Sequence, residues 1–412
     1  MKKQIARLGR VTAVAVAACL GNSSGNIAAT KLGDTSHPAQ RGSPIEELRA
    51  ACGSGAPTPA GSVIVRQPYL QQVTSTSALV GWVSISPDGE HVDITRPDGT
   101  LVLQAMAEPE DVVVRNAGET QQWARVDGLT PNTIYCYRMA NGTPLSERTG
   151  FRTAPAIDDP KAVRFLAFGD SGGGGSDQRA LLARMFEFPY ELIIHTGDLA
   201  YDDGSIDEFE DNVFGFYEEL FKNLPFFPAA GNHEYNTDDA VPFRSVFALP
   251  GMETWYSYDW GRVHFVALDT EASYETQAAW LDEDLTATTQ PWKIVYMHRP
   301  PYSSGEHGSD TSLRAALAPI LEKHHVQLVL SAHDHDYERM IPQNGVAYVV
   351  TGGGGKGTRE VDSSSFTAFS DEVIHFVYGE VGVDELILHA VDATGVEFDS
   401  LVVPLSSAQT SR

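Results

Sequence analysis

The amino-acid sequence predicts a chain of mixed α+β and α/β class, with an all-β domain followed by an α/β domain. Short runs of alternating apolar and polar residues, separated by Pro-Asp-Gly turns, fill residues 62–154 and are typical of a β-sandwich. From residue 162 onward, apolar strand-like runs alternate with helix-like segments, which is the pattern of an α/β domain. The 412-residue length accommodates both domains and a leader.

The composition restricts the classes of partner. The formal net charge is -26 at pH 7, and such an acidic surface repels nucleic acid, so we expect no nucleic-acid binding. An anionic substrate would need local positive charge, which a metal cluster would supply. The sequence does not indicate an oligomeric state.

The first residues predict export. Residues 1–10 are basic, residues 11–18 are apolar, and this run is too short to cross a bilayer. The stretch 16–19 resembles a bacterial lipobox, so residues 1–18 are predicted to be a lipoprotein-type signal and Cys19 a lipid-anchoring site. The alternative is an ordinary secretory signal cut slightly later. The protein is therefore expected in the cell envelope, lipid-anchored, or secreted.

Residues 19–61 are rich in Gly, Ser, Ala and Pro and predict a flexible tether, with one short helical indication at 44–51. Two cysteines remain, Cys52 and Cys136. In an exported protein they form a disulfide or remain two unrelated thiols, and the sequence does not decide between these.

The all-β domain is expected at residues 62–154. The predicted strands are 78–83, 92–95, 112–115 and 122–126. Residues 128–137 resemble the late strands of a fibronectin type III domain, in which a tyrosine anchors a corner between strands, and Tyr135 is the candidate. Trp82 and Trp123 are expected to pack in the sandwich core. We assign this domain no chemistry.

A linker at 153–161 leads to the α/β domain, which is expected at 162–404 and is followed by a tail at 405–412. Helices are predicted at 176–187, 205–222, 274–286 and 312–324, and the chain returns to β structure from about residue 373.

Apolar runs of this domain end repeatedly in residues that bind metals. Each run is followed by one of these motifs: Gly169-Asp170, Gly197-Asp198 with Tyr201, Gly231-Asn232-His233-Glu234, His298, and His333-Asp334-His335. Each motif alone has an ordinary explanation, such as a turn, a helix cap or a core histidine. Together they predict that strand ends meet at one crevice. Carboxylate, amide, imidazole and phenolate donors suit first-row transition metals rather than calcium.

The order of these motifs is similar to that of the calcineurin-like metallophosphoesterases. Gly-Asp-x-x-Tyr at 197–201 and His-x-His-x-Tyr-Glu-Arg at 333–339 resemble the purple acid phosphatase branch. The resemblance implies a fibronectin type III-like β-sandwich followed by a metallophosphoesterase domain of two packed β-sheets flanked by helices. Ala332 stands where many relatives have glycine.

The resemblance also implies roles for the motif residues. Asp198 would bridge two metals. Asp170, Tyr201 and His335 would complete the first, Fe(III). Asn232, His298 and His333 would complete the second, a divalent Fe, Zn or Mn. The implied reaction is binuclear hydrolysis of phosphate monoesters, an acid phosphatase activity, by metal-bound hydroxide.

Two further histidines are catalytic candidates. His233 is expected to point toward substrate. His307 resembles a family histidine that protonates the leaving oxygen, and its alternative is a solvated loop residue. Asp334 and Asp336 alternate with ligand histidines and either orient their rings or face water, and we expect at least one to face water.

The glycine run 352–357 lacks the Ser or Thr of a phosphate-binding P-loop, so we expect it to give backbone freedom beside the site. Other functions remain open at this stage. They are an exported phosphodiesterase or phospholipase-like enzyme, and a non-catalytic metal- or phosphate-binding protein. The presence of the whole ligand set and of His233 argues against the non-catalytic alternative.

Overall fold

The computed structural model describes residues 28–29, 38–55, 63–85 and 87–405. The predicted signal, Cys19 and the tail beyond residue 405 lie outside these residues. Within them, none of the helices has the length and apolar character needed to cross a membrane.

The N-terminal domain is a β-sandwich of two four-stranded sheets. One sheet has the order β2 (Ile64–Gln71), β3 (Ser77–Ile85), β7 (Glu119–Asp127), β6 (Glu108–Glu110), and the other β5 (Leu101–Met106), β4 (His91–Thr95), β8 (Ile134–Ala140), β9 (Thr149–Arg152). Trp82 is fully buried between the sheets, as expected, whereas Trp123 is only partly buried. The Tyr135 hydroxyl accepts a hydrogen bond from the Thr130 amide at 3.0 Å, which is the contact of a tyrosine corner.

The strand predicted at 112–115 is wrong. These residues leave the sheet and contact the second domain: the Val113 amide donates to the Ser245 hydroxyl at 3.3 Å, and Arg115 pairs with Asp207 at 2.7 Å. Tertiary contacts therefore override the local β propensity of this stretch.

Part of the predicted tether is folded. Helix α1 (Glu46–Cys52) lies within residues 19–61, and its Leu48 packs into the core together with Ile45. Cys52 and Cys136 form a disulfide that joins α1 to β8. Residues 38–55 thus belong to the folded body, since a buried helix and a crosslink hold them there.

The second domain consists of two seven-stranded sheets. The first has the order β1 (Ala28–Ala29), β22 (Glu397–Pro404), β21 (Glu385–Asp392), β20 (His375–Val381), β10 (Val163–Phe168), β11 (Leu192–His195), β12 (Phe226–Pro228). The second has the order β13 (Tyr256–Trp260), β14 (Val263–Ala267), β15 (Trp292–Tyr296), β16 (Leu328–Ser331), β18 (Ala347–Thr351), β17 (Tyr337–Met340), β19 (Thr367–Asp371).

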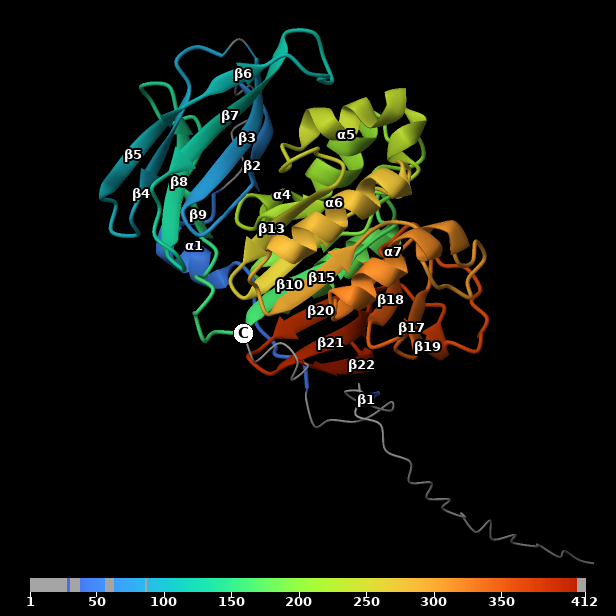
Figure 1. The fold of residues 1–412 in the computed structure, drawn as a ribbon. Helices are drawn as coiled ribbons and strands as arrows, with labels where there is room; N and C mark the ends of the chain where they lie inside the picture. Colours follow the sequence, from blue (N-terminus) through green and yellow to red (C-terminus); the bar gives the residue numbers. More distant parts are fainter. Residues whose placement is uncertain (1–27, 30–37, 56–62, 86, 406–412) are drawn as a thin grey trace, which may run out of the picture.

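The two sheets pack face to face, and helices cover their outer faces (Figure 1). Phe165 of β10 and Phe265 of β14 meet across the interface with ring centroids 5.8 Å apart. Helices α6 (Tyr274–Ala287) and α7 (Thr311–Lys323) cover the second sheet, and α2 (Ser176–Met185) lies on the first. The remaining helical segments are α3 (Ile206–Glu208), the π-helix η1 (Phe209–Phe214), α4 (Gly215–Phe221), η2 (Glu234–Asn236), η3 (Asp238–Ala240) and α5 (Val241–Val246).

The arrangement of parallel strands places the motif residues. Strands β10, β11 and β12 run parallel in the first sheet, and β14, β15, β16 and β18 run parallel in the second. Their carboxyl ends therefore lie on common edges, where ligands bind in α/β sheets.

Candidate metal centre

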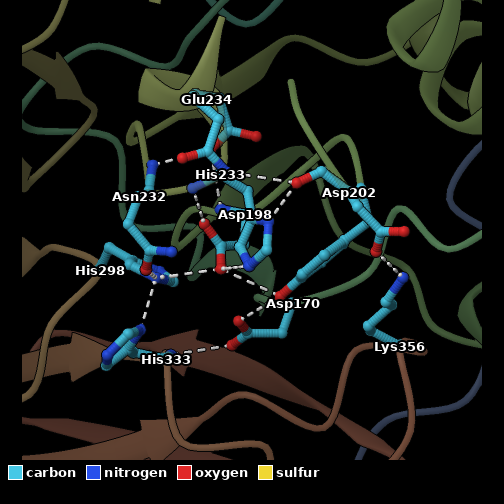
Figure 2. A network of polar contacts seen from close by, with 12 residues as sticks. Asp170, Asp198, Asp202, Asn232, His233, Glu234, His298, His333 and Lys356 are labelled. Atoms are coloured by element: carbon cyan, nitrogen blue, oxygen red, sulfur yellow. Dashed lines mark hydrogen bonds and ion pairs between the residues drawn. The ribbon is translucent and has the colours of Figure 1, made fainter. Parts of the chain in front are cut away.

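Residues that follow strands of both sheets form one cluster. Asp170 follows β10, Asp198 follows β11 and Asn232 follows β12, while His298 follows β15 and the His333–His335 pair follows β16. Figure 2 shows Asp170, Asp198, Asn232, His298 and His333 pointing toward one another. The two packed sheets thus contribute donors to the same place.

The turns that carry these residues have unusual backbone conformations. Asp170, Asp198 and His333 have positive φ angles of 57°, 56° and 71°. Such angles are uncommon for residues other than glycine and persist only where surrounding contacts hold them. A Cβ on Gly231 would lie 2.2 Å from an Asp198 carboxylate oxygen, so glycine is required for this close approach.

One half of the cluster consists of Asp170, Tyr201 and His335. The Tyr201 hydroxyl lies 2.7 Å from Asp170 Oδ1 and 3.2 Å from His335 Nε2. His335 Nε2 lies 3.3 Å from the same Asp170 oxygen. Burial, together with Asp170 and Asp198, raises the pKa of Tyr201 well above its usual value. A phenolate at this position therefore requires a cation to offset the two carboxylates.

The other half consists of Asn232, His298 and His333. His298 Nε2 lies 3.1 Å from Asn232 Oδ1 and 3.1 Å from His333 Nδ1. His298 Nδ1 faces the Thr196 carbonyl oxygen at 3.0 Å. If that nitrogen donates to the carbonyl, Nε2 keeps its lone pair directed into the cluster, as a metal ligand requires.

Asp198 lies between the two halves. Its Oδ2 is 3.0 Å from the Tyr201 hydroxyl and 3.3 Å from His298 Nε2. Burial alone would raise the pKa of this carboxyl, but the His298 imidazole holds it below its usual value. Ligand atoms of Asp198, His298 and His333 all lie within 4.8 Å of one another, so they could hold a single ion.

The donor set fits a pair of first-row transition metals. Each half offers oxygen and imidazole nitrogen donors around a central carboxylate that has an oxygen in reach of both. This mixture of donors suits Fe, Zn or Mn better than the all-oxygen shell of calcium.

Glu234 organises the loop that carries Asp198, a role that the sequence did not assign. Its fully buried carboxylate accepts hydrogen bonds from the backbone amides of Asp198, Leu199, Ala200 and Gly231 at 2.7–3.1 Å. The signal was present, because Glu234 ends the Gly-Asn-His-Glu motif.

His233 lies at the edge of the cluster. Its amide donates to Asp198 Oδ1 at 2.9 Å, and its Nε2 lies 3.8 Å from Asp198 Oδ2. The partly exposed ring packs 4.3 Å from the Tyr201 ring and places Nδ1 2.5 Å from the Asp202 carbonyl oxygen (Figure 2). This position gives the ring access to both the cluster and solvent.

His307 is exposed and stacks on the His333 ring, with centroids 4.2 Å apart. Its Nε2 faces the Arg359 guanidinium. The structure therefore places this histidine beside the second half of the cluster rather than in an isolated loop.

The expectation that Asp334 or Asp336 faces water is wrong, because both are fully buried. Asp334 accepts hydrogen bonds from the His307 and Gly308 amides at 2.7 and 3.2 Å, and so holds the 303–308 loop over the cluster. The carboxylate oxygens of Asp336 have no hydrogen-bond partner among the described residues, and burial and neighbouring carboxylates raise the pKa of this group to about 8.

The glycine run 352–357 passes beside the cluster. The Gly354 amide donates to the Gly169 carbonyl at 2.9 Å, and the Lys356 amide donates to the Asp170 carbonyl at 3.0 Å. A Cβ on Gly352 would lie 2.7 Å from Asp170 Oδ2. The run thus allows backbone to approach a predicted ligand closely, as the sequence suggested.

Three basic side chains flank the cluster and were not predicted. Lys356 lies 4.6 Å from the Tyr201 ring centroid and pairs with Asp202 at 2.6 Å (Figure 2). Arg299 and Arg359 lie near His333 and His307 on the other side. Arg299 follows His298 and Lys356 lies in the glycine run expected beside the site, but the sequence assigned neither a role, and no motif indicated Arg359.

Known proteins resemble both parts of the chain. The calcineurin-like phosphoesterase family matches residues 163–337, and the purple acid phosphatase N-terminal domain matches residues 65–153. This second match defines the sandwich more closely than its likeness to fibronectin type III.

Individual relatives are consistent with these matches. Purple acid phosphatase 23 of Arabidopsis thaliana is 27% identical over 62% of this chain and 67% of its own length. Human acid phosphatase type 7 is 29% identical over 52% of this chain and 55% of its own. The chain thus spans between about half and two thirds of these two relatives.

A solved structure shares the fold. The structure of PhoD aligns with a TM-score of 0.62 and 13% identity over 85% of this chain and 94% of its own. The two matched domains, in their order along the chain, place the protein in the calcineurin-like phosphoesterase superfamily, in its purple acid phosphatase branch.

Proposed function

We propose that this protein hydrolyses phosphate monoesters as a binuclear metal-dependent acid phosphatase. The observation that carries the proposal is the convergence of the donor side chains in two halves around Asp198, whose Oδ2 lies 3.0 Å from Tyr201 and 3.3 Å from His298. A single carboxylate in reach of both halves is the arrangement that a metal pair needs.

Each half would hold one metal. Asp170, Tyr201 and His335 would bind Fe(III), and Asn232, His298 and His333 would bind a divalent Fe, Zn or Mn, with Asp198 shared. When bound, such a pair supplies Lewis acidity toward phosphoryl oxygens and a nucleophile that forms at modest pH.

The chain's own residues would orient the substrate and manage its protons. His233 is only partly exposed and lies 3.8 Å from Asp198, which suits an imidazole that hydrogen-bonds a phosphoryl oxygen. His307 would donate a proton to the leaving oxygen, for which its Nε2 has to exchange the Arg359 guanidinium for the substrate. Asp334 holds the His307 backbone in place.

Support for monoester hydrolysis comes from the names of relatives. They include purple acid phosphatases, acid phosphatase type 7 and the phosphoenolpyruvate phosphatase of Allium cepa. A phosphodiesterase or phospholipase-like activity is the alternative within the superfamily. One relative is named probable inactive purple acid phosphatase 1, so a non-catalytic function is the second alternative to test.

Turnover assays separate these three functions. Purified protein, with its metals measured, is assayed on 4-nitrophenyl phosphate and on bis-4-nitrophenyl phosphate, with the Asp198→Ala and His298→Ala variants as blanks. Monoester turnover that the variants lack supports the proposal. Faster diester turnover, or metal binding without turnover, contradicts it.

We also propose that the protein is exported and anchored by a lipid on Cys19. The Cys52–Cys136 disulfide supports export, because disulfides persist in oxidising compartments. The Cys19→Ser variant is expected to leave the detergent phase, since acylation contributes about 0.8 kcal/mol per buried CH₂. Unchanged partitioning of the variant would leave simple secretion as the explanation.

A further inference from the structure

A row of basic side chains extends outward from the second half of the cluster. It consists of Arg299, His333, His307 and Arg359. The Arg299 guanidinium lies 3.2 Å from His333 Nε2, the His307 ring stacks on the His333 ring at 4.2 Å, and Arg359 contacts His307 Nε2. In a chain with a net charge of -26, such a row beside the reaction centre calls for a function.

Arg299 is fixed in orientation. Its Nε and Nη2 bind the two carboxylate oxygens of Glu271 at 2.6 and 3.1 Å, which leaves Nη1 directed at His333. His333 turns its Nδ1 toward His298, and coordination there would make its Nε2 an N–H donor. The Nη1 N–H groups would then lose their acceptor and be available to a substrate oxygen. This step rests on the proposed function.

Arg359 lies across the outer end of the row. Its amide donates to the His335 carbonyl at 3.0 Å, so its backbone is anchored at the cluster. Its carboxylate neighbour Glu306 is 3.7 Å away and mostly exposed, and the guanidinium instead contacts the His307 imidazole. A neutral imidazole nitrogen is a weaker partner for a guanidinium than a carboxylate or phosphate. An anion that arrives here would therefore displace His307.

On the opposite side of the cluster, the basic side chain already has a close carboxylate partner. Lys356 forms a 2.6 Å ion pair with Asp202, so its charge is already matched by a close carboxylate. Arg359 has its carboxylate partner Glu306 at the longer distance of 3.7 Å, and it lies next to the histidine proposed to serve the leaving group.

We propose that Arg359, with Arg299 behind it, binds a second anionic group on the leaving-group side of the substrate. The preferred substrates are then small phosphate esters or anhydrides whose leaving group carries a carboxylate or a phosphate. Binding of this second anion would also release His307 Nε2 from Arg359.

A matched pair of substrates tests the carboxylate case. 2-Phosphoglycolate and 2-hydroxyethyl phosphate have leaving groups of similar size, and only the first carries a second anion. In the Arg359→Met variant, kcat/KM for 2-phosphoglycolate is expected to fall about 10- to 100-fold more than for 2-hydroxyethyl phosphate, as for loss of a hydrogen bond between charged groups. Arg299→Met should show a smaller selective loss, and Arg359→Lys should restore part of the selectivity.

Inorganic pyrophosphate, compared with 2-hydroxyethyl phosphate, provides the phosphate arm and shows which second anion the row prefers. Arg314→Met is the control, since this arginine packs on the Tyr302 ring from helix α7. Equal losses of kcat/KM on substrates with charged and with uncharged leaving groups, or a wild-type protein without selectivity in either arm, overturn the proposal. A metal-loaded wild type that hydrolyses none of these substrates contradicts the proposed phosphatase function itself.

Discussion

The two halves of the predicted metal cluster differ in charge and in donor type. The half formed by Asp170, Tyr201 and His335 contains a carboxylate and a phenol 2.7 Å apart. The half formed by Asn232, His298 and His333 contains one amide and two imidazoles. An anionic donor set stabilises a trivalent cation, whereas a neutral set suits a divalent one. This difference in charge between the halves follows from which donors the folded chain brings together, and the order of the motifs along the sequence does not by itself show that grouping.

The two halves are alike in where their donors come from. Each takes donors from both sheets: Asp170 and His335 meet across the sheet interface in one, and Asn232 and His298 in the other. Neither half forms unless the sheets pack, so metal binding and domain folding are expected to support each other.

The largest expected effect comes from the residue that both halves share. Asp198→Ala should lose both metals and nearly all activity, because its Oδ2 is in reach of Tyr201 and His298. Elemental analysis of the purified variant measures the loss. Asp177→Ala, on the first turn of α2, is the control. Two metals per chain in Asp198→Ala would refute the assignment of the shared ligand.

Glu234→Gln should weaken both halves without removing a ligand. The carboxylate accepts backbone N–H groups of Asp198, Leu199, Ala200 and Gly231, and an amide replaces one of its acceptor oxygens with an N–H donor. Metal affinity is expected to fall about 10- to 100-fold, as for other residues that orient ligands. Chelator competition on both metals measures it, and a loss confined to one metal would contradict the mechanism.

These residues show what the sequence could predict. Local order along the chain was enough to place Asp170, Asp198, Asn232 and His298 just after strands, because each comes shortly after an apolar run. Glu234 was visible in a motif, but its contacts with Asp198 and Leu199 were not, since these residues lie about 35 positions earlier in the chain.

Other features depend on contacts that only the folded chain forms. Arg359 reaches the cluster from a loop without a recognisable pattern, and the contact of Arg299 with His333 was not predicted although Arg299 follows His298. The stretch 112–115 reads as a strand locally, yet Arg115 is drawn to Asp207 and Asp211 of the other domain. The short helix indicated at 44–51 is confirmed by α1, but its place in the folded body was not predicted, because the disulfide and the burial of Leu48 are long-range features.

Asn232→Ala tests whether the two halves bind their metals independently. It removes the amide oxygen that lies 3.1 Å from His298 Nε2, so the second metal should bind more weakly while the first is retained. Metal content after dialysis is expected to approach one per chain, with activity restored by excess divalent metal. Loss of both metals in parallel would mean that the halves are not independent.

The smallest expected effect on turnover, and the most specific for the first half, comes from Tyr201→Phe. The Tyr201 hydroxyl lies 2.7 Å from Asp170, 3.0 Å from Asp198 and 3.2 Å from His335. Burial and the two carboxylates raise its pKa, so only a strongly charged cation would hold it as a phenolate. A phenolate on Fe(III) absorbs visible light by charge transfer, and Fe(III) also favours ionisation of water at low pH. We therefore expect a coloured wild-type protein with an acidic optimum.

Tyr201→Phe should lose the visible absorption band and keep measurable hydrolysis, because the remaining donors still hold the cation and Asp198 is still shared. Absorption spectra and pH profiles of the two proteins, at matched metal content, give the comparison. An active wild-type protein that is colourless, lacks iron and works best at alkaline pH would remove Fe(III) from the first half. The charge asymmetry between the halves would then select a different metal, and Tyr201 would serve as a hydrogen-bond donor to Asp170 rather than as a ligand.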